Sequence, residues 1–344
     1  MTIIDYGITN YIREQNLIND LNVFRVTGLN YSTFTLHNRY NESIKVPLGT
    51  EESDITLGDF VQVEEVNHHY FILRKFERVS VISKAASTAK KSYAYNEKEQ
   101  ALAANVDQLF ILIAADQRFS LSKFERYYLT FTSQVAESHV VISKSDFIKE
   151  TERIQSIILN VYPNVDIHEV TVFDKEKTEK FKNMFKENKT SILLGASGVG
   201  KSTLINRMMQ QSLLNTQPVR RDGKGKHTTT SSSLYYLEQT NSYIIDTPGF
   251  KTIATHKETD DSVLFQEIYN LSQECRFNDC SHTQEPGCAI QSAIKSGNLS
   301  SELYDRYLLI RDKEIRYKNF LSKKASRKKQ KKPMKVITKS GVRY

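Results

Sequence analysis

The stretch Gly195-Ala196-Ser197-Gly198-Val199-Gly200-Lys201-Ser202 decides the fold of this chain. It fills every fixed position of the phosphate-loop pattern G-x-x-x-x-G-K-[ST]. Residues 190–194 are typical of a short buried strand, and a helical composition begins at Thr203. In such a strand–loop–helix unit, backbone N–H groups and a helix N-terminus point at phosphate oxygens. An ordinary glycine-rich turn is the alternative, which the complete motif disfavours.

The phosphate loop predicts a nucleotide site with a divalent cation. We expect residues 195–203 to contact the nucleotide. Lys201 is expected to reach the β- and γ-phosphates and to act in catalysis, and the Ser202 hydroxyl is expected to bind Mg²⁺.

Two later segments are expected to complete the phosphate-binding part of the nucleotide site. The run 242–245 leads into Asp246-Thr247-Pro248-Gly249, where we expect Asp246 to hold Mg²⁺ and the Gly249 N–H to meet the γ-phosphate. The glycine-rich run 223–230 is expected to act as a switch in which a threonine, here assigned as Thr229, coordinates Mg²⁺. Together these segments predict an NTPase. A kinase or transferase is the alternative, but the sequence offers no evident acceptor pocket.

The length and composition set the broad class. A chain of 344 residues with 39% hydrophobic and 26% charged residues predicts a globular protein of two or three domains. No apolar run is long enough to span a membrane, and the N-terminus lacks the features of a signal peptide. We therefore expect a cytoplasmic monomer without a membrane partner.

The N-terminal part is strand-rich. Five short alternating segments between residues 22 and 84 are separated by Gly, Asn and Asp turns, which favours a small all-β barrel of the OB-fold kind over residues 1–84. Its aromatic and basic residues are candidates for nucleic-acid contacts, although several of the aromatics are better explained as core.

Strands and helices alternate from residue 107 onward, after a polar linker over 84–100. The expected strands are 107–114, 139–143, 166–172 and 190–194, and the expected helices are 121–137, 149–160 and 175–187. This alternation predicts a parallel, doubly wound sheet. We assign residues 85–252 to this α/β domain.

The second of these strands ends in Ser143-Lys144-Ser145-Asp146, a candidate base-reading loop. GTPases read guanine with Asn-Lys-x-Asp at such a position. The Asp146 carboxylate can accept hydrogen bonds from guanine N1–H and N2–H₂, and the Lys144 stem can lie along the base. Because Ser143 replaces Asn and the next strand ends in a poorly matching Val170-Thr171-Val172, we expect weaker affinity with retained selectivity. A plain surface turn is the alternative.

All three cysteines lie within fourteen residues, in the pattern Cys275-x₄-Cys280-x-His282-x₅-Cys288. Three thiols and one imidazole suit a tetrahedral, structural Zn²⁺ site. Three buried free cysteines are the alternative. We assign residues 253–322 to a mainly helical zinc-binding domain.

The net charge of +8 is concentrated at the C-terminus. Residues 323–344 contain ten Lys and Arg residues and no acidic residue, so the rest of the chain is close to neutral. Such a run predicts a disordered arm that binds a polyanion. A solvated tail without a partner is the alternative.

The order of these motifs identifies a family. The base-reading loop precedes the phosphate loop, whereas in ordinary GTPases it follows the D-x-x-G segment. The chain therefore resembles the circularly permuted GTPases, and most closely the RsgA (YjeQ/YloQ) family of small-ribosomal-subunit-dependent GTPases. The runs 104–108, 223–229, 246–249 and 275–288 carry the resemblance.

The resemblance implies a function. It implies that the chain binds GTP and GDP and hydrolyses GTP in late maturation of the small (30S) ribosomal subunit, binding rRNA, with turnover stimulated by the ribosome. Phe250 stands where many GTPases have a water-orienting Gln, so the resemblance suggests His227 as the catalytic group. His227 could instead contact RNA or phosphate. A nucleotide-gated RNA-binding module with little turnover, from a diverged paralogue, is the alternative function.

Overall fold

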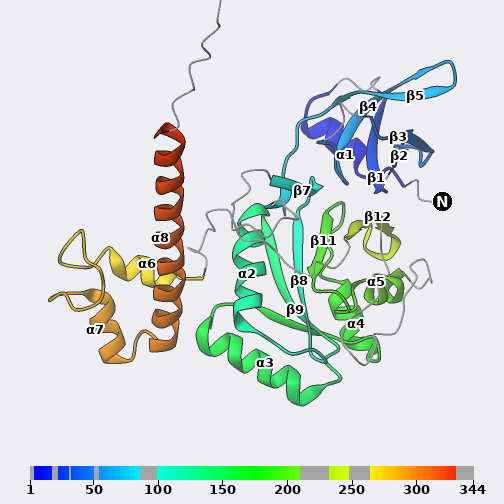
Figure 1. The fold of residues 1–344 in the computed structure, drawn as a ribbon. Coiled ribbons are helices and arrows are strands. Elements are labelled where there is room, and N and C mark those ends of the chain that lie inside the picture. Colours follow the sequence, from blue (N-terminus) through cyan, green and yellow to red (C-terminus); the bar gives the residue numbers. More distant parts are fainter. Residues whose placement is uncertain are drawn as a thin grey trace, which may run out of the picture. The chain divides into compact units, whose positions relative to one another are not determined.

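The computed structural model describes residues 4–17, 22–30, 32–49, 54–85, 99–209, 232–247 and 264–330. The chain divides into two compact units, Met1–Asp261 and Ser262–Tyr344 (Figure 1). The larger unit contains both the strand-rich N-terminal part and the α/β domain.

The N-terminal part contains the five expected strands. Helix α1 (Ile8–Glu14) precedes β1 (Val23–Leu29), β2 (Thr33–Asn38), β3 (Ser43–Pro47), β4 (Phe60–Val66) and β5 (His69–Lys75). Strand β1 pairs antiparallel with both β2 and β4, while β3 pairs with β2 and β5 pairs with β4. The inward residues of these strands form one apolar core, made of Phe24, Val26, Phe34, Leu36, Val46, Val61 and Val63.

Two paired strands lie at the two ends of the segment that we expected to be a linker. Strand β6 (Val81–Ala85) pairs antiparallel with β7 (Glu99–Ala104), and residues 86–98 between them lie outside the described residues. The linker prediction was therefore wrong at residues 84, 85, 99 and 100. Alanine has a low strand propensity, so the sequence gives little indication of β7, although Ala103 and Ala104 are fully buried.

The α/β domain is built on a six-strand order, β10-β9-β8-β11-β13-β12. The five parallel strands are β10 (Ile167–Val170), β9 (Glu137–Ser143), β8 (Gln108–Ala114), β11 (Thr190–Gly195) and β13 (Ser242–Asp246). Strand β12 (Ser232–Leu237) departs from the all-parallel expectation because only Glu238–Thr240 and one further residue join it to β13, and so short a connection gives an antiparallel hairpin.

The helices of this domain are α2 (Leu121–Phe131), α3 (Ile148–Val161), α4 (Lys175–Lys182) and α5 (Lys201–Met209). Two of them, α2 and α4, end earlier than expected, whereas α3 extends one residue beyond its expected range at each end. A single 3₁₀ turn, Thr132–Gln134, follows α2, and β9 begins soon after it. Side chains of α4 and α5 share one core with inward residues of the central strands, among them Phe110, Leu193 and Ile244.

The strands of the N-terminal part and those of the α/β domain belong to one continuous sheet, because β12 also pairs with β1. The paired residues are Gly28 with Ser233 and Leu29 with Ser232. Beside this junction lies Arg25, which is only 2% exposed. Its guanidinium donates to the carbonyl of Tyr6 at 2.9 Å and to Thr190 Oγ1 at 2.8 Å, with longer contacts to the carbonyls of Gly58 and Asn105 at 3.4 Å. One side chain of β1 thus connects the residues just before α1 to the first residue of β11.

The smaller unit contains α6 (Gln266–Ser272), α7 (Ala289–Ser296) and α8 (Ser301–Gln330). Residues 323–330, which we expected to be disordered, continue α8 as helix. Lys, Arg, Ala and Gln are strong helix formers, and the first proline after the start of α8 is Pro333. The rest of the basic run lies outside the described residues. Although α8 is 30 residues long, neither it nor any other helix in the described ranges is apolar enough to cross a membrane.

Replacing Arg25 with Met tests the junction. We expect the substitution to lower the free energy of unfolding by about 2–4 kcal/mol, because buried carbonyls and a hydroxyl lose their donor. The control is Arg74→Met, where an exposed guanidinium donates to Gln62 and lies over the ring of Phe76, and a loss below about 1 kcal/mol is expected. Urea unfolding followed by circular dichroism measures both, and equal losses would contradict the assigned role.

Candidate functional site

The phosphate loop joins the end of β11 to the start of α5, as the sequence predicts. Gly195 is packed against β8, where a Cβ atom would lie 2.7 Å from the carbonyl oxygen of Leu112. Gly198 and Gly200 have φ values of 79° and 94°, a region that favours glycine. The glycines are therefore required by the path of the backbone.

Lys201 is 6% exposed and points into the loop. Its Nζ donates to the carbonyl oxygen of Gly195 at 3.1 Å and lies 3.4 Å from that of Ala196. Burial lowers the pKa of Lys201 to about 8, and Asp246 opposes this shift. Carbonyl groups compensate a buried ammonium only in part, so an anion held by this loop would stabilise the charged form.

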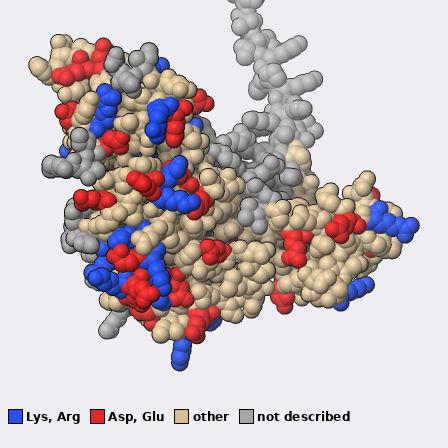
Figure 2. Space-filling view, turned by 180° about the vertical axis from the view of Figure 1, so that it is seen from behind, with Lys and Arg blue, Asp and Glu red and all other residues tan. Residues whose placement is uncertain are grey.

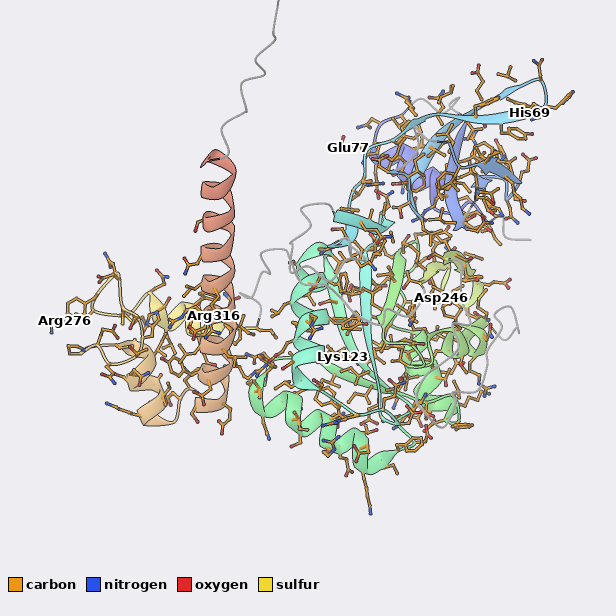
Figure 3. All side chains as sticks on the ribbon, in the orientation of Figure 1. His69, Glu77, Lys123, Asp246, Arg276 and Arg316 are labelled. Atoms are coloured by element: carbon orange, nitrogen blue, oxygen red, sulfur yellow. The ribbon has the colours of Figure 1, made fainter. Side chains whose placement is uncertain are left out.

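Asp246 lies at the carboxyl end of β13 (Figure 3). It is 1% exposed. Its Oδ2 accepts a hydrogen bond from Ser202 Oγ at 2.9 Å. Burial raises the pKa of Asp246. Its Oδ1 is buried and has no hydrogen-bond partner in the described ranges. A carboxylate with a spare oxygen beside a hydroxyl is an oxygen donor set that fits Mg²⁺.

The predicted base-reading loop is attached to the phosphate loop. Ser143 Oγ lies 2.7 Å from the carbonyl oxygen of Val199. Lys144 has a left-handed φ of 57°, and its Nζ donates to the carbonyl oxygen of Gly198 at 2.9 Å and to Asp116 Oδ2 at 2.6 Å. The structure therefore brings together two loops that are more than fifty residues apart in the sequence.

Asp146 has a partner that the sequence analysis did not find. Thr171 Oγ1 donates to Asp146 Oδ1 at 2.6 Å, and the backbone N–H of the buried Ser145 donates to the carbonyl oxygen of Val170 at 3.2 Å. Thr171 lies in the strand end that we regarded as a poor match. The position of Thr171 in the sequence could have identified it. The carboxyl ends of the adjacent parallel strands β9 and β10 lie at the same edge of the sheet, so residues that follow them come close together.

Two further residues contact the loops from the end of β8. Asp116 pairs with Lys144, and Gln117 Nε2 donates to the carbonyl oxygen of Ser197 at 3.2 Å. The sequence analysis did not single them out. By contrast, the predicted residues His227, Thr229 and Gly249 lie outside the described residues.

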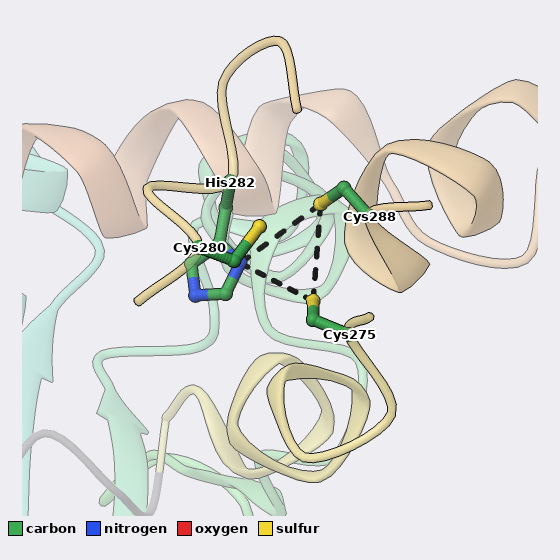
Figure 4. Close-up of side chains that lie close together, drawn as sticks. All are labelled: Cys275, Cys280, His282 and Cys288. Atoms are coloured by element: carbon green, nitrogen blue, oxygen red, sulfur yellow. Dashed lines mark hydrogen bonds between the residues drawn. The ribbon is translucent and has the colours of Figure 1, made fainter. Parts of the chain in front are cut away.

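The three cysteines and His282 converge in the smaller unit (Figure 4). The sulfurs of Cys275 and Cys288 are 3.9 Å apart, and they lie 3.5 and 3.9 Å from Nδ1 of His282. All four ligand atoms, including that of Cys280, lie within 4.8 Å of one another. Ligands of tetrahedral Zn²⁺ with Zn–S bonds of about 2.3 Å are separated by similar distances. The cluster therefore fits Zn²⁺.

This cluster also organises the helices around it. Cys288 is the N-cap of α7, where its sulfur accepts from the N–H of Gln291 at 3.5 Å. The carbonyl oxygen of His282 accepts from Gln291 Nε2 at 2.8 Å and from the hydroxyl of Tyr304 in α8 at 2.5 Å. A metal held there would thus connect the loop to α7 and α8.

Family models match most of the chain. The model described as RsgA GTPase matches residues 77–256, and one described as 50S ribosome-binding GTPase matches residues 190–339. The first match extends over the base-reading loop, the phosphate loop and the D-x-x-G segment.

Relatives match nearly the whole length. A protein of Listeria monocytogenes (serotype 4b, strain F2365) called small ribosomal subunit biogenesis GTPase RsgA 2 is 32% identical over 99% of this chain and 97% of its own. A protein of the same name from Vibrio parahaemolyticus is 36% identical over 74% and 69%.

Solved structures show the same fold at lower identity. YjeQ from Thermotoga maritima aligns with a TM-score of 0.57 at 21% identity, over 84% of this chain and 96% of that one. YloQ, described as a circularly permuted GTPase, aligns with a TM-score of 0.54 at 19% identity, over 85% and 94%. The fold is that of a circularly permuted GTPase.

Removing one sulfur tests the metal cluster. We expect Cys288→Ser to reduce bound zinc from about one per chain to near zero and to destabilise the smaller unit, because the ligand also caps α7. Elemental analysis of the purified protein measures the zinc. The control is Asn278→Ala, an exposed residue of the same loop, which should retain zinc. Full zinc in Cys288→Ser would contradict the ligand assignment.

Proposed function

The chain belongs to the RsgA GTPase family, and from that premise we propose that it hydrolyses GTP in the maturation of the small ribosomal subunit. The observation that carries the proposal is the attachment of the base-reading loop to the phosphate loop through Ser143 and Lys144. The family model naming the 50S subunit begins only at residue 190, whereas relatives aligned over almost the full chain are named for the small subunit.

We assign guanine recognition to Asp146. In this proposal its carboxylate accepts N1–H and N2–H₂ of guanine, and Thr171 keeps the carboxylate in place through Oδ1. Ser145 and the stem of Lys144 complete the base site. Adenine has no hydrogen at N1 and no amino group at C2, so it cannot supply either donor.

We assign phosphate binding to residues 195–203 and to the N–H of Gly249. Lys201 holds the β- and γ-phosphates, while Ser202, Thr229 and Asp246 hold Mg²⁺. The ion would neutralise charge that develops on the phosphates during transfer. The buried Oδ1 of Asp246, which has no hydrogen-bond partner among the described residues, supports this assignment.

We assign orientation of the attacking water to His227, because Phe250 cannot donate or accept a hydrogen bond through its side chain. Hydrolysis is then slow in the free protein and accelerates when the ribosome contacts residues 223–230. Lys201 stabilises the phosphoryl group throughout the reaction.

We assign the flanking parts to structure and RNA binding. Strand β1 lies between β2 and β4, and β3 lies against β5, an arrangement that supports an OB-like barrel. The Cys₃His cluster would hold structural Zn²⁺. Figure 2 shows basic and acidic side chains interspersed over one face of the larger unit. The run from Lys323 onward contains ten basic residues and no acidic residue, so we assign an rRNA contact to it.

Changing the proposed base reader to an amide should change the base. We expect Asp146→Asn to lower GTP affinity about 100-fold or more and to favour XTP, because an amide can donate to the xanthine O2. The control is Asp116→Asn, a nearby carboxylate that pairs with Lys144 and should give no gain for XTP. Competition with a fluorescent nucleotide measures both, and unchanged GTP preference in Asp146→Asn would overturn the assignment.

The ribosomal function predicts a separate kinetic signature. GTP hydrolysis, and not ATP hydrolysis, should accelerate on addition of purified small ribosomal subunits. His227→Ala should lower the stimulated rate about 100-fold while nucleotide affinity stays within about threefold, because a water-orienting group acts only in the reaction. His256→Ala is the control. Lost nucleotide binding in His227→Ala would show a structural role, and absent stimulation of the wild type would overturn the proposal.

A further inference from the structure

A second group of potential metal ligands lies far along the sheet from the proposed nucleotide site. His139, Asp166 and His168 each offer one ligand atom, and these atoms lie within 4.8 Å of one another. His139 belongs to β9, His168 belongs to β10, and Asp166 directly precedes β10, so all three lie near the amino ends of these strands. The proposed base-reading loop lies at the carboxyl end of β9, and Thr171 directly follows β10.

The strand geometry places the three side chains on one face. Asp166 and His168 are two residues apart along the chain, a spacing at which strand side chains point the same way. Strands β9 and β10 are parallel, with Ile167 beside Val140, so continuation of this register puts Asp166 beside His139. The donor set is therefore positioned by the sheet itself and needs no loop rearrangement.

The hydrogen bonding of His168 also points to a ligand. Its Nε2 lies 2.8 Å from Asp166 Oδ2, but the direction is unsuitable for a hydrogen bond. This buried nitrogen consequently has no hydrogen-bond partner in the described part of the chain. A buried imidazole nitrogen without such a partner normally costs free energy, and metal coordination would remove that cost.

His139 is held in position by its neighbours. Its ring stacks on the buried Phe110 with centroids 4.9 Å apart, and its Nε2 lies 3.1 Å from Glu137 Oε1. The other oxygen of Glu137 pairs with Lys186 at 2.5 Å. Burial lowers the pKa of His139, and Glu137 opposes this shift.

We propose that His139, Asp166 and His168 form a second metal site, which binds a divalent transition-metal ion such as Ni²⁺, Cu²⁺ or Zn²⁺. Two imidazoles and one carboxylate are the ligands that these ions prefer, whereas Mg²⁺ prefers oxygen ligands alone. The side chain of Asp166 is 74% exposed and that of His168 is 33% exposed, so solvent can reach the ion and complete its coordination. The bound ion clamps β9 to the edge strand β10.

The experiment is a calorimetric titration of the tag-free, full-length protein with Ni²⁺. The Cys₃His site is first filled with a single equivalent of Zn²⁺, because thiolate sites bind Zn²⁺ preferentially, and unbound Zn²⁺ is removed by gel filtration. Millimolar Mg²⁺ is present to occupy oxygen-only sites. We expect one equivalent of Ni²⁺ to bind and to raise the Tm.

Three variants separate this site from chance surface binding. His168→Ala and Asp166→Asn should each bind Ni²⁺ at least about tenfold more weakly and lose the rise in Tm. Asp166→Asn changes an exposed side chain, so its loss of binding cannot be attributed to misfolding. The matched control is His68→Ala, which removes an exposed histidine that pairs with Glu65. No binding by the wild type, or wild-type affinity in Asp166→Asn and His168→Ala, would overturn the proposal.

Discussion

The larger unit depends on a buried positive charge, the guanidinium of Arg25. Burial lowers the pKa of Arg25 to about 10, yet the group remains protonated at neutral pH. In the described ranges its hydrogen bonds go to carbonyl and hydroxyl oxygens, and the rings of Phe60 and Tyr243 lie 4.9 and 5.5 Å from its central carbon. Such a charge is tolerated only where several dipoles and π faces converge. The strand-rich part and the α/β domain must therefore keep their relative positions at this point.

The same junction connects the N-terminal strands to the proposed nucleotide site. Strand β11 begins at Thr190, which Arg25 contacts, and ends at Gly195 in the phosphate loop. Strand β12, which follows the proposed switch in sequence, pairs with β1 at its first two residues. A force applied to the N-terminal strands by a ribosomal partner would consequently act on β11 and β12. These strands adjoin the phosphate loop and the proposed switch in the sequence.

How far the sequence could predict this site depends on whether a residue acts locally. The phosphate loop and the Cys₃His cluster were found because their residues are close in sequence and chemically distinctive. Thr171 and Asp116 were missed because each acts through a partner at least 25 residues away, and a lone Thr or Asp after a strand is common. The antiparallel strand β12 was not predicted. The expected pattern was an alternation of strands and helices, and β12 is joined to β13 by a short connection without a long helix.

The serine at position 143 shows how the missing asparagine is replaced. An asparagine amide offers two donor hydrogens and an acceptor, so it can contact the phosphate loop and the base together, whereas a hydroxyl has one hydrogen to donate. Ser143 directs its hydroxyl at the carbonyl of Val199, 2.7 Å away, which favours attachment of the phosphate loop over contact with the base. In the proposed base site, selection would then rest on Asp146, whose carboxylate accepts a hydrogen bond from the hydroxyl of Thr171 at 2.6 Å. That contact would hold the carboxylate in place, so the second departure from the common GTPase pattern would compensate for the first.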